Sequence, residues 1–446
     1  MTDRVRITVS GLRGQVPEAL NVDIVSRFAS AFSTYLEKGG LALGRDPRES
    51  SPMLAMAARS SVMAAGLDCF DWGMLPTPCL QFAMRRESFS GGISVSGGHN
   101  PLPWNAVILL NQQGAYLETS EGTEVFNVFE AGDFQKARWL DLGSTRRRDF
   151  PVEFYLKEMS GLVDRERIRK SSFKVAADTC NGASSAVIKL LSDFFGLRLV
   201  ALHDDPALPF PHPPEPSPAQ AAQVEAVVGA TGADMGILFN SDGSRLSFVT
   251  ERGKALSEEM TLPLCLLSLQ GRIAKVVTTL STSRFTDWAA EKTGVKIVKT
   301  KVGQSAVVNT MIAASAEAGG EGSGSLAYAP FSFGYDAMLA LVLVLDLLAG
   351  RGQSLSEVVS PFPPLTMKKI KIDVPPEKTY QMMDRLEDVY AAENPDFSDG
   401  IRIDREDVWF HIRPSMTEFI LRLHIEGDSP VVVAAVEEEI RERIRF

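Results

Sequence analysis

The chain has 446 residues, of which 45% are apolar and 23% charged, and it carries a net charge of -10 with a pI near 5.2. Its length is enough for several buried cores, about three domains by size alone. The acidic balance argues against nucleic acid or an anionic membrane surface as the main partner, because both are polyanions that select basic patches.

No stretch of the sequence predicts a membrane segment or a signal peptide. The longest apolar run, Ala337 to Ala349, includes Asp346 and is shorter than the roughly 20 residues that cross a bilayer. The start, MTDRVRITVS, favours a first strand over an apolar leader, so we expect a cytoplasmic protein. The cysteines lack CxxC spacing and are interpreted as small buried hydrophobes, neither a zinc knuckle nor a disulfide framework. They are Cys69, Cys79, Cys180 and Cys265.

Helical and strand patterns alternate through the first three quarters of the chain, which favours α/β domains. Residues Val22 to Leu36 are predicted to be a helix, because Ile24, Phe28, Phe32 and Tyr35 share one face. The pattern then predicts a βαβ rhythm with a strand at Leu41 to Gly44, a helix at Met53 to Gly66 and a strand at Cys69 to Trp72.

A second unit is predicted after the charged stretch Arg146 to Asp149, and a third from Met260 onward. Proline lacks a donor N–H, so the Pro-rich segment Pro206 to Pro218 must be an ordered loop or crossing segment. The other elements expected here are a helix in 150–163, the strand Phe173 to Ala176, the helix Ser184 to Phe195, a helix over Met260 to Leu269, the strand Val276 to Leu280 and the helix Ala337 to Leu348.

The last unit follows the apolar loop Ser360 to Pro364 and alternates apolar with polar residues in KIKIDV, VWFHIRP and FILRLHIEG, a strand pattern. It ends on a helix capped by Ser429 with Pro430 at its first position. Val432, Val436, Ile440 and Ile444 are expected on its buried face. The predicted domains are therefore 1–149, 150–253, 254–364 and 365–446.

Five short motifs, each weak alone, occur in a characteristic order. They are SGLRG from Ser10 with GRDPRES from Gly44, GMLPTP from Gly73 leading into GGISVSGGHNPLPWNAVILL from Gly91, ADMGILFNSDGSR from Ala233, GGEGSG from Gly319, and HIRPSMTE from His411. Together they resemble the α-D-phosphohexomutase superfamily, and most of all its phosphoglucosamine mutase and phosphomannomutase branches, over the whole chain.

The resemblance implies an α/β fold with four domains around a central cleft. Three are α/β/α domains and the fourth is a smaller α+β domain of the TATA-box-binding-protein type. In the family, the first domain bears a phosphoserine, the second binds Mg²⁺, the third selects the sugar and the fourth grips the substrate phosphate. A phosphoryl group passes from the serine to the sugar and another returns after the bisphosphate reorients.

The phosphate and sugar loops match the family best. Arg413, Ser415 and Thr417 match its Arg-Pro-Ser-Gly-Thr, with Met416 in place of the glycine, and an arginine fork with hydroxyls suits a phosphate. The alternatives are a plain turn for this loop and a flexible Gly-rich turn for the sugar loop. The resemblance adds as substrate-binding candidates Glu321 and Ser323 of the sugar loop, Arg13 and Lys301.

The metal loop has only part of the family's Asp-x-Asp-x-Asp-Arg, represented here by Asn240, Asp242, Ser244 and the adjacent Arg245. Mg²⁺ needs hard oxygen ligands and negative charge, and this set is two carboxylates short. We therefore expect weak Mg²⁺ binding or none, and favour a structural turn.

The catalytic loop differs most. Aligning its His-Asn-Pro with the family places Gly98 at the phosphoserine, and glycine has no oxygen to phosphorylate. Ser96 lies roughly 6 to 7 Å away if the segment is extended, and is a poor substitute nucleophile. His99 either stabilises the loop or transfers a proton. Ile108 stands where the family often has a lysine, and an aliphatic side chain transfers no proton.

These differences affect three steps of one mechanism, so the leading hypothesis is a phosphohexomutase-like protein that folds normally, binds a phosphosugar or phosphate, and has little or no mutase activity. It would act as a sensor, regulator or assembly partner. One alternative is an active mutase, interconverting hexose 6- and 1-phosphates, with an unusual catalytic residue. Another is a non-catalytic scaffold that binds a protein partner or a second copy of the chain.

Overall fold

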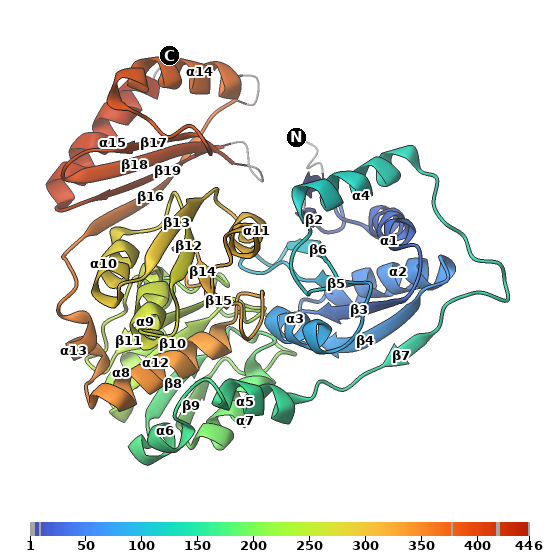
Figure 1. Cartoon of the computed structure of the whole chain (residues 1–446), viewed down its shortest axis with the longest axis horizontal. Coiled ribbons are helices and arrows are strands. Elements are labelled where there is room, and N and C mark those ends of the chain that lie inside the picture. The colour runs from blue at the N-terminus through green and yellow to red at the C-terminus, as the bar shows by residue number, and fades with distance from the viewer. Residues whose placement is uncertain (1–4, 9, 376–377, 416–419, 445–446) are drawn as a thin grey trace.

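The computed structural model describes residues 5–8, 10–375, 378–415 and 420–444. Four sheets follow one another along the chain, and helices cover them (Figure 1). The first and last domains lie on opposite sides of the molecule in this view, with the middle two between and below them. The expected α/β class, with three α/β/α domains and a C-terminal fourth, is confirmed.

The first domain is built on a seven-stranded sheet in the order β1-β2-β6-β5-β3-β4-β7. Successive strand residues face opposite layers: Leu41 and Leu43 pack with α1, α2 and α4, whereas Ala42 packs with α3. Its elements are β1 Arg6–Thr8, β2 Gly11–Gln15, α1 Val22–Leu36, β3 Gly40–Arg45, α2 Ser51–Ala64, β4 Asp68–Met74, α3 Thr77–Arg86, β5 Gly91–Val95, β6 Trp104–Leu110, α4 Thr119–Ala131 and β7 Thr145–Arg147.

The second domain has a four-stranded sheet in the order β11-β10-β8-β9, in which β10, β8 and β9 run parallel and β11 antiparallel. The Pro-rich segment is an ordered loop that follows β9, as the sequence predicted. The elements are α5 Val152–Ser160, α6 Arg165–Ser171, β8 Lys174–Asp178, α7 Ser185–Phe195, β9 Arg198–Leu202, a 3-10 turn Pro218–Gln220, α8 Ala222–Thr231, β10 Met235–Phe239 and β11 Leu246–Thr250.

The third domain has the strand order β13-β12-β14-β15 and contains the most apolar helix, α12, which packs against α9 and α6. Asp336 caps α12 through its side chain, which accepts from Leu339 N. The elements are a 3-10 turn Glu258–Met260, α9 Thr261–Ser268, β12 Lys275–Thr279, α10 Arg284–Thr293, β13 Lys296–Thr300, α11 Gln304–Ala314, β14 Ala318–Gly320, β15 Ala327–Tyr328, α12 Ala337–Arg351 and α13 Leu355–Val359. Among the described residues, no helix is long and apolar enough to cross a membrane.

The fourth domain is an antiparallel sheet in the order β16-β19-β18-β17, with α14 and α15 on one face. Ser429 precedes α15 and its Oγ accepts from Val432 N at 3.4 Å, consistent with the predicted cap. The helix buries Val433 in addition to the expected Val436 and Ile440. The elements are β16 Thr366–Asp373, α14 Thr379–Tyr390, a 3-10 turn Ala391–Glu393, β17 Ile401–Asp404, β18 Val408–Pro414, β19 Ile420–Gly427 and α15 Pro430–Ile444.

Several predicted ends differ by one to three residues. Helix α2 begins at Ser51 rather than Met53, since Pro52 is tolerated in a first turn, and it ends before Gly66, whose φ is +91°. Strand β3 extends to Arg45. This residue still pairs with Met74 of β4, after a register shift that follows Leu43, and with Val95 of β5. The sequence signals mark where elements exist better than where they stop.

Asp336 generates a prediction about stability and pH. Burial raises the pKa of this carboxyl to about 6, while Tyr155 Oη donates to both of its oxygens at 2.8 and 2.9 Å. The folded state therefore holds the proton more tightly than the unfolded chain, so the stabilisation is full below pH about 4 and is lost as pH rises through about 6.

An Asp336→Asn variant keeps a capping side chain but cannot ionise. We expect the stability of the parent to fall relative to this variant by up to about 3 kcal/mol between pH 4 and pH 6.5, measured by urea unfolding. Asp164→Asn, at the exposed cap of α6, is the matched control. A constant difference between parent and variant across this range would contradict the prediction.

Candidate functional site

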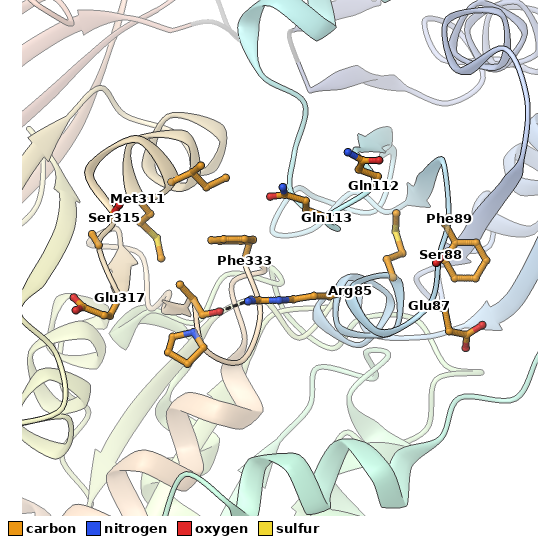
Figure 2. A pocket seen from close by; sticks show the side chains of 15 residues that line it. Arg85, Glu87, Ser88, Phe89, Gln112, Gln113, Met311, Ser315, Glu317 and Phe333 are labelled. Atoms are coloured by element: carbon orange, nitrogen blue, oxygen red, sulfur yellow. Dashed lines mark hydrogen bonds between the residues drawn. The ribbon is translucent and has the colours of Figure 1, made fainter.

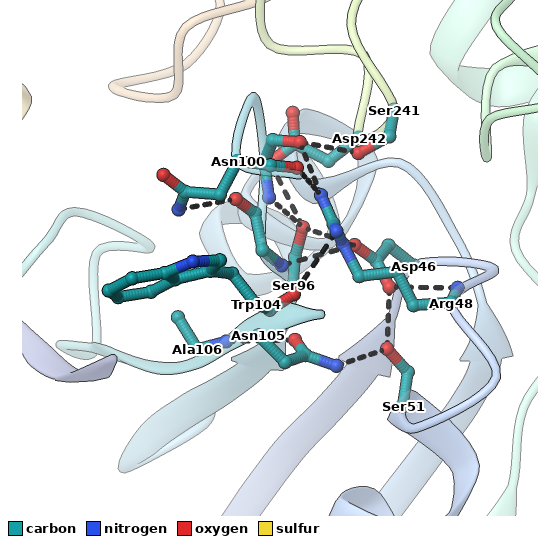
Figure 3. A network of polar contacts seen from close by, with 12 residues as sticks. Asp46, Arg48, Ser51, Ser96, Asn100, Trp104, Asn105, Ala106, Ser241 and Asp242 are labelled. Atoms are coloured by element: carbon teal, nitrogen blue, oxygen red, sulfur yellow. Dashed lines mark hydrogen bonds and ion pairs between the residues drawn. The ribbon is translucent and has the colours of Figure 1, made fainter. Parts of the chain in front are cut away.

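The segment after β5 forms a tight turn instead of continuing the strand. Ser96 is buried, and its Oγ lies 3.0 Å from Asp46 Oδ2 and 3.3 Å from Asp242 Oδ2. The same Oγ accepts a hydrogen bond from Gly98 N at 3.1 Å. This hydrogen bond bends the chain, so residues 96–98 are not extended. The separation of Ser96 from residue 98 that an extended segment would give does not apply. The Ser96 hydroxyl is enclosed between two carboxylates (Figure 3).

Gly98 lies in left-handed backbone with φ +54°, a conformation that glycine adopts without steric cost. A Cβ built there would meet only Asp242 Oδ2, at 3.6 Å. A side chain at this position would therefore have room and would point toward the Asp242 loop. The backbone at residue 98 could therefore carry a side chain with a hydroxyl, although glycine supplies none.

The guanidinium group of Arg48 holds this turn. It pairs with Asp46 at 3.0 Å, and both side chains are almost fully buried. It also donates to the carbonyl oxygens of Gly98 and Asn100 at 2.9 and 2.7 Å. Two further carbonyls accept from Nη1, those of Pro101 at 2.8 Å and Trp104 at 3.1 Å. A planar fork of donors can serve so many acceptors at once, and a lysine cannot.

Asp242 lies in the turn between β10 and β11, and described protein groups surround both of its oxygens. Oδ1 accepts from Asn240 Nδ2 at 2.8 Å and from Ser244 Oγ at 2.7 Å. Oδ2 faces Ser96 and, at 3.3 Å, Thr77 Oγ1. The amide oxygen of Asn240 in turn accepts from Ser244 N and from Arg245 N.

This donor set does not fit Mg²⁺. One carboxylate is present, its oxygens already accept protein hydrogen bonds, and the neighbouring amide points its N–H group toward it. The turn is also a junction between domains, because Ser241 Oγ donates to Gly98 O at 2.6 Å and Thr77 N donates to Asp242 O at 3.0 Å. These contacts make the turn a structural junction between the first and second domains.

His99 faces a group of arginines drawn from three domains. The positive charge of Arg245, then burial, then the charges of Arg13, Arg422 and Arg48 hold the pKa of His99 well below its usual range. The imidazole is therefore neutral at pH 7. Arg13 itself lies on β2, paired with Ala106 of β6, and burial lowers its pKa. The convergence of these cations, which we call the arginine cluster (Arg13, Arg48, Arg245 and Arg422), predicts affinity for an anion.

The sheet of the fourth domain supplies cations because its two faces differ. Ile370, Ile412 and Leu423 point into the core under α14 and α15. The residues between them share the opposite face, since cross-strand partners lie on the same side of a sheet. That face carries Lys369 paired with His424, Lys371 paired with Arg422, His411 paired with His424, and Arg413 paired with Arg422.

Arg413 is the one predicted phosphate-loop side chain with an unsatisfied donor among the described residues. Its Nε is buried without a hydrogen-bond partner, and burial lowers its pKa while Arg422 lies near. A buried guanidinium N–H without an acceptor is costly unless a ligand supplies one. Ser415 lies at the end of β18, and its Oγ accepts from Arg422 Nε at 3.4 Å. Thr417 and Met416 lie outside the described residues.

The sugar loop lies beside this face. Glu321 accepts from Gly303 N at 2.9 Å and from Tyr335 Oη at 3.2 Å, so the carboxylate is held in place from two sides. Ser323 Oγ is 3.4 Å from Ser325 Oγ. Lys301 is exposed just after β13, in the segment whose Val302 N donates to Asp399 Oδ2 of the fourth domain at 2.8 Å.

Sequence reasoning missed several residues of the site. The sequence does not single out Arg48 within its motif, because its partners are backbone carbonyls 50 to 56 residues away, which leave no side-chain pattern. Arg422 and His424 could have been found, because every second residue of LRLH is basic where the strand alternates. Lys369 also escaped notice; its Nζ donates to Gly322 O of the sugar loop at 2.7 Å.

A separate hollow of about 880 Å³ lies between α3 and the α11 side of the third domain (Figure 2). Its one arginine, Arg85, is engaged: it donates to Ala329 O and stacks over the Phe333 ring with the guanidinium carbon 4.9 Å from the centroid. None of the predicted site residues lines it. The arginine cluster is therefore a different place from this hollow.

Family models of phosphoglucomutase/phosphomannomutase match the chain in four consecutive parts. The alpha/beta/alpha domain I matches residues 5–136, domain II 153–253, domain III 258–365 and the C-terminal domain 370–443.

Curated relatives and solved structures cover nearly the whole chain. The chain is 30% identical over 449 residues to a phosphoglucomutase/phosphomannomutase of Thermococcus kodakarensis, covering 98% of the chain and 96% of the relative. It is 30% identical to a probable phosphoglucosamine mutase of Pyrococcus horikoshii, covering 98% and 95%. A crystal structure of a phosphoglucomutase/phosphomannomutase family protein from Burkholderia thailandensis shares the fold, with a TM-score of 0.84 and 23% identity over 98% and 97% of the two chains.

Arg48→Lys tests what holds the turn. A lysine keeps the charge beside Asp46 but cannot serve four carbonyls, so we expect a loss of about 3 kcal/mol or more and faster hydrogen exchange in residues 97–104. Arg45→Lys is the control, since Arg45 donates one bond, to Asp46 O at 3.3 Å. Unchanged exchange in the Arg48 variant would show that the turn is held by other contacts.

Proposed function

Because the chain belongs to the phosphoglucomutase/phosphomannomutase family, we propose that it binds a phosphorylated hexose or inorganic phosphate where its four domains meet, without passing a phosphoryl group through residue 98. The observation that carries the binding half is the set of cations on that centre: Arg13, Arg245 and Arg422 of the arginine cluster, together with Arg413 and its unpaired Nε. Arg48 is not counted, because its charge is paired with Asp46. A phosphate offers the charge and the several acceptor oxygens that such groups select.

The proposed binding mode assigns one role to each part. Arg413, Ser415 and Thr417 grip the phosphate, with Lys301 and Arg13 adding positive charge. The carboxylate of Glu321 accepts hydrogen bonds from sugar hydroxyls, and the hydroxyl of Ser323 donates one to them. Supporting this assignment, Glu321 is already oriented by Gly303 N and Tyr335 Oη, so little rotamer freedom is lost when a ligand binds.

Two features of the turn support the proposal that no phosphoryl group passes through residue 98. Gly98 carries no hydroxyl, and the Ser96 hydroxyl is buried between Asp46 and Asp242. Two carboxylates that face Ser96 would also repel an incoming phosphate. Phosphoryl transfer needs a nucleophile in line and neutralisation of the developing charge. The turn that carries Asp242 supplies one carboxylate for a metal ion, and the neighbouring Asp46 is already paired with Arg48.

Isothermal titration with glucose 1-phosphate, glucosamine 6-phosphate and inorganic phosphate tests the binding half. We expect at least one to bind, and Arg413→Met to weaken it roughly 10- to 100-fold, because a hydrogen bond to a charged group contributes about 1.5 to 3 kcal/mol. Arg385→Met, an exposed arginine of α14 on the far side of the same sheet, should leave binding unchanged. No heat with any of the three ligands would refute this half.

Phosphorylation at residue 98 tests the other half. The parent should gain no phosphate in peptide 94–104 after incubation with glucose 1,6-bisphosphate and Mg²⁺, whereas Gly98→Ser with Asn240→Asp and Ser244→Asp should gain one. Gly98→Ala in the same background is the matched control, since it adds the same Cβ and the same strain of about 1 kcal/mol at φ +54° without a hydroxyl. A phosphorylated parent would contradict the proposal.

An active mutase with a different nucleophile is the second candidate, favoured by the names of the curated relatives. A coupled assay that follows glucose 6-phosphate from glucose 1-phosphate, with hexose 1,6-bisphosphate and Mg²⁺ added, separates the two. Turnover above about 1 s⁻¹, inside the usual range of enzymes, would establish this second candidate in place of the first.

A further inference from the structure

Two of the chain's five histidines meet one carboxylate in the second domain. Asp178 ends β8 and His203 follows β9, and these strands are parallel neighbours with Asp178 in register with Leu202. His212 comes from the Pro-rich loop and reaches back to the same edge. Asp178 Oδ2 lies 2.9 Å from His203 Nδ1 and 3.0 Å from His212 Nε2.

Neighbouring backbone groups orient two of these three side chains, Asp178 and His212. The other oxygen of Asp178 accepts from Cys180 N at 2.8 Å, which leaves Oδ2 facing the imidazoles. The other nitrogen of His212, Nδ1, lies 2.9 Å from Pro213 O, so its N–H is directed to a backbone carbonyl. Histidines that ligate a metal ordinarily have their second nitrogen held in this way.

We infer that Asp178, His203 and His212 form a binding site for a divalent transition-metal ion, with zinc as the first candidate, through Oδ2, Nδ1 and Nε2 respectively. The three ligand atoms lie within 4.8 Å of one another. Ligands around a four-coordinate zinc at about 2.0 to 2.1 Å are roughly 3.3 Å apart. The two histidine–carboxylate distances, 2.9 and 3.0 Å, therefore need to lengthen by only a few tenths of an ångström. The ion takes the place of protons between the nitrogens and the carboxylate.

The choice of ion follows from the donor atoms. Two imidazole nitrogens and one carboxylate oxygen suit zinc and its neighbours in the first transition row, whereas Mg²⁺ and Ca²⁺ select oxygen donors. Asp178 is buried at 1% exposure, but the imidazoles of His203 and His212 are 22% and 15% exposed, so an ion can enter from their side. Water can complete the coordination there.

Such an ion would fasten the Pro-rich loop against the proposed binding centre. Two residues before His212, the ring of Phe210 covers Arg48, with the guanidinium carbon 4.9 Å from its centroid. Further along the same loop, Glu215 approaches Arg245 to 3.9 Å. The site is therefore a positioning device: it anchors a loop whose side chains contact two members of the arginine cluster.

Zinc titration of the full-length, chelator-treated protein against a chromophoric competitor tests the inference. We expect one equivalent to bind, and His203→Gln, His212→Gln and Asp178→Asn each to weaken binding at least tenfold. Asp204→Asn, in the same loop but paired with Lys189 at 2.6 Å, should bind like the parent. Circular dichroism without metal shows whether each variant is folded.

A second measurement does not depend on the variants. Co²⁺ bound by two nitrogens and an oxygen in a four-coordinate site gives intense visible absorption, which zinc should then abolish by displacement. Hydrogen exchange of residues 203–215 should slow when zinc is added. Failure of the parent to bind either ion below about 10 µM, or equal binding by parent and all three variants, would overturn the inference and leave the phosphosugar proposal intact.

Discussion

The buried pair of Arg48 and Asp46 is the interaction on which the rest of the centre depends. Its guanidinium gathers four backbone carbonyls from a turn that has no regular secondary structure, and its carboxylate partner also accepts from Gly97 N. Backbone groups buried in such a turn would otherwise lack partners. This pair holds the turn through backbone groups, so the shape of the turn does not depend on a side chain at residue 98, which is a glycine.

The elements with strong local signals could be predicted from sequence, and those defined by distant contacts could not. Helix α1 spans Val22 to Leu36 as predicted because Asn21 caps it and its apolar face repeats. The bend at Gly98 could not be predicted, since it comes from a hydrogen bond of Gly98 N to Ser96 Oγ that no sequence pattern indicates. The arginine cluster was found only in part, because its members come from three domains and meet only in the folded chain.

The Asp242 turn is a joint between domains. Its hydrogen bonds tie the first domain to the second through Ser96, Thr77 and Gly98, and Ala337 N of α12 donates to Gly243 O at 3.1 Å. Within the turn, Asn240 and Ser244 donate neutral hydrogen bonds to its one carboxylate, so no second negative charge repels it there.

The two-faced sheet of the fourth domain has a consequence for how an anion reaches the protein. Its basic residues look inward, yet the whole chain is acidic by ten charges, so the excess of carboxylates must lie elsewhere. The basic strands of this sheet attract an approaching phosphate ester, whereas the net negative charge of the chain repels it. Added salt weakens both effects, and the rate of encounter then reflects simple diffusion to a small target.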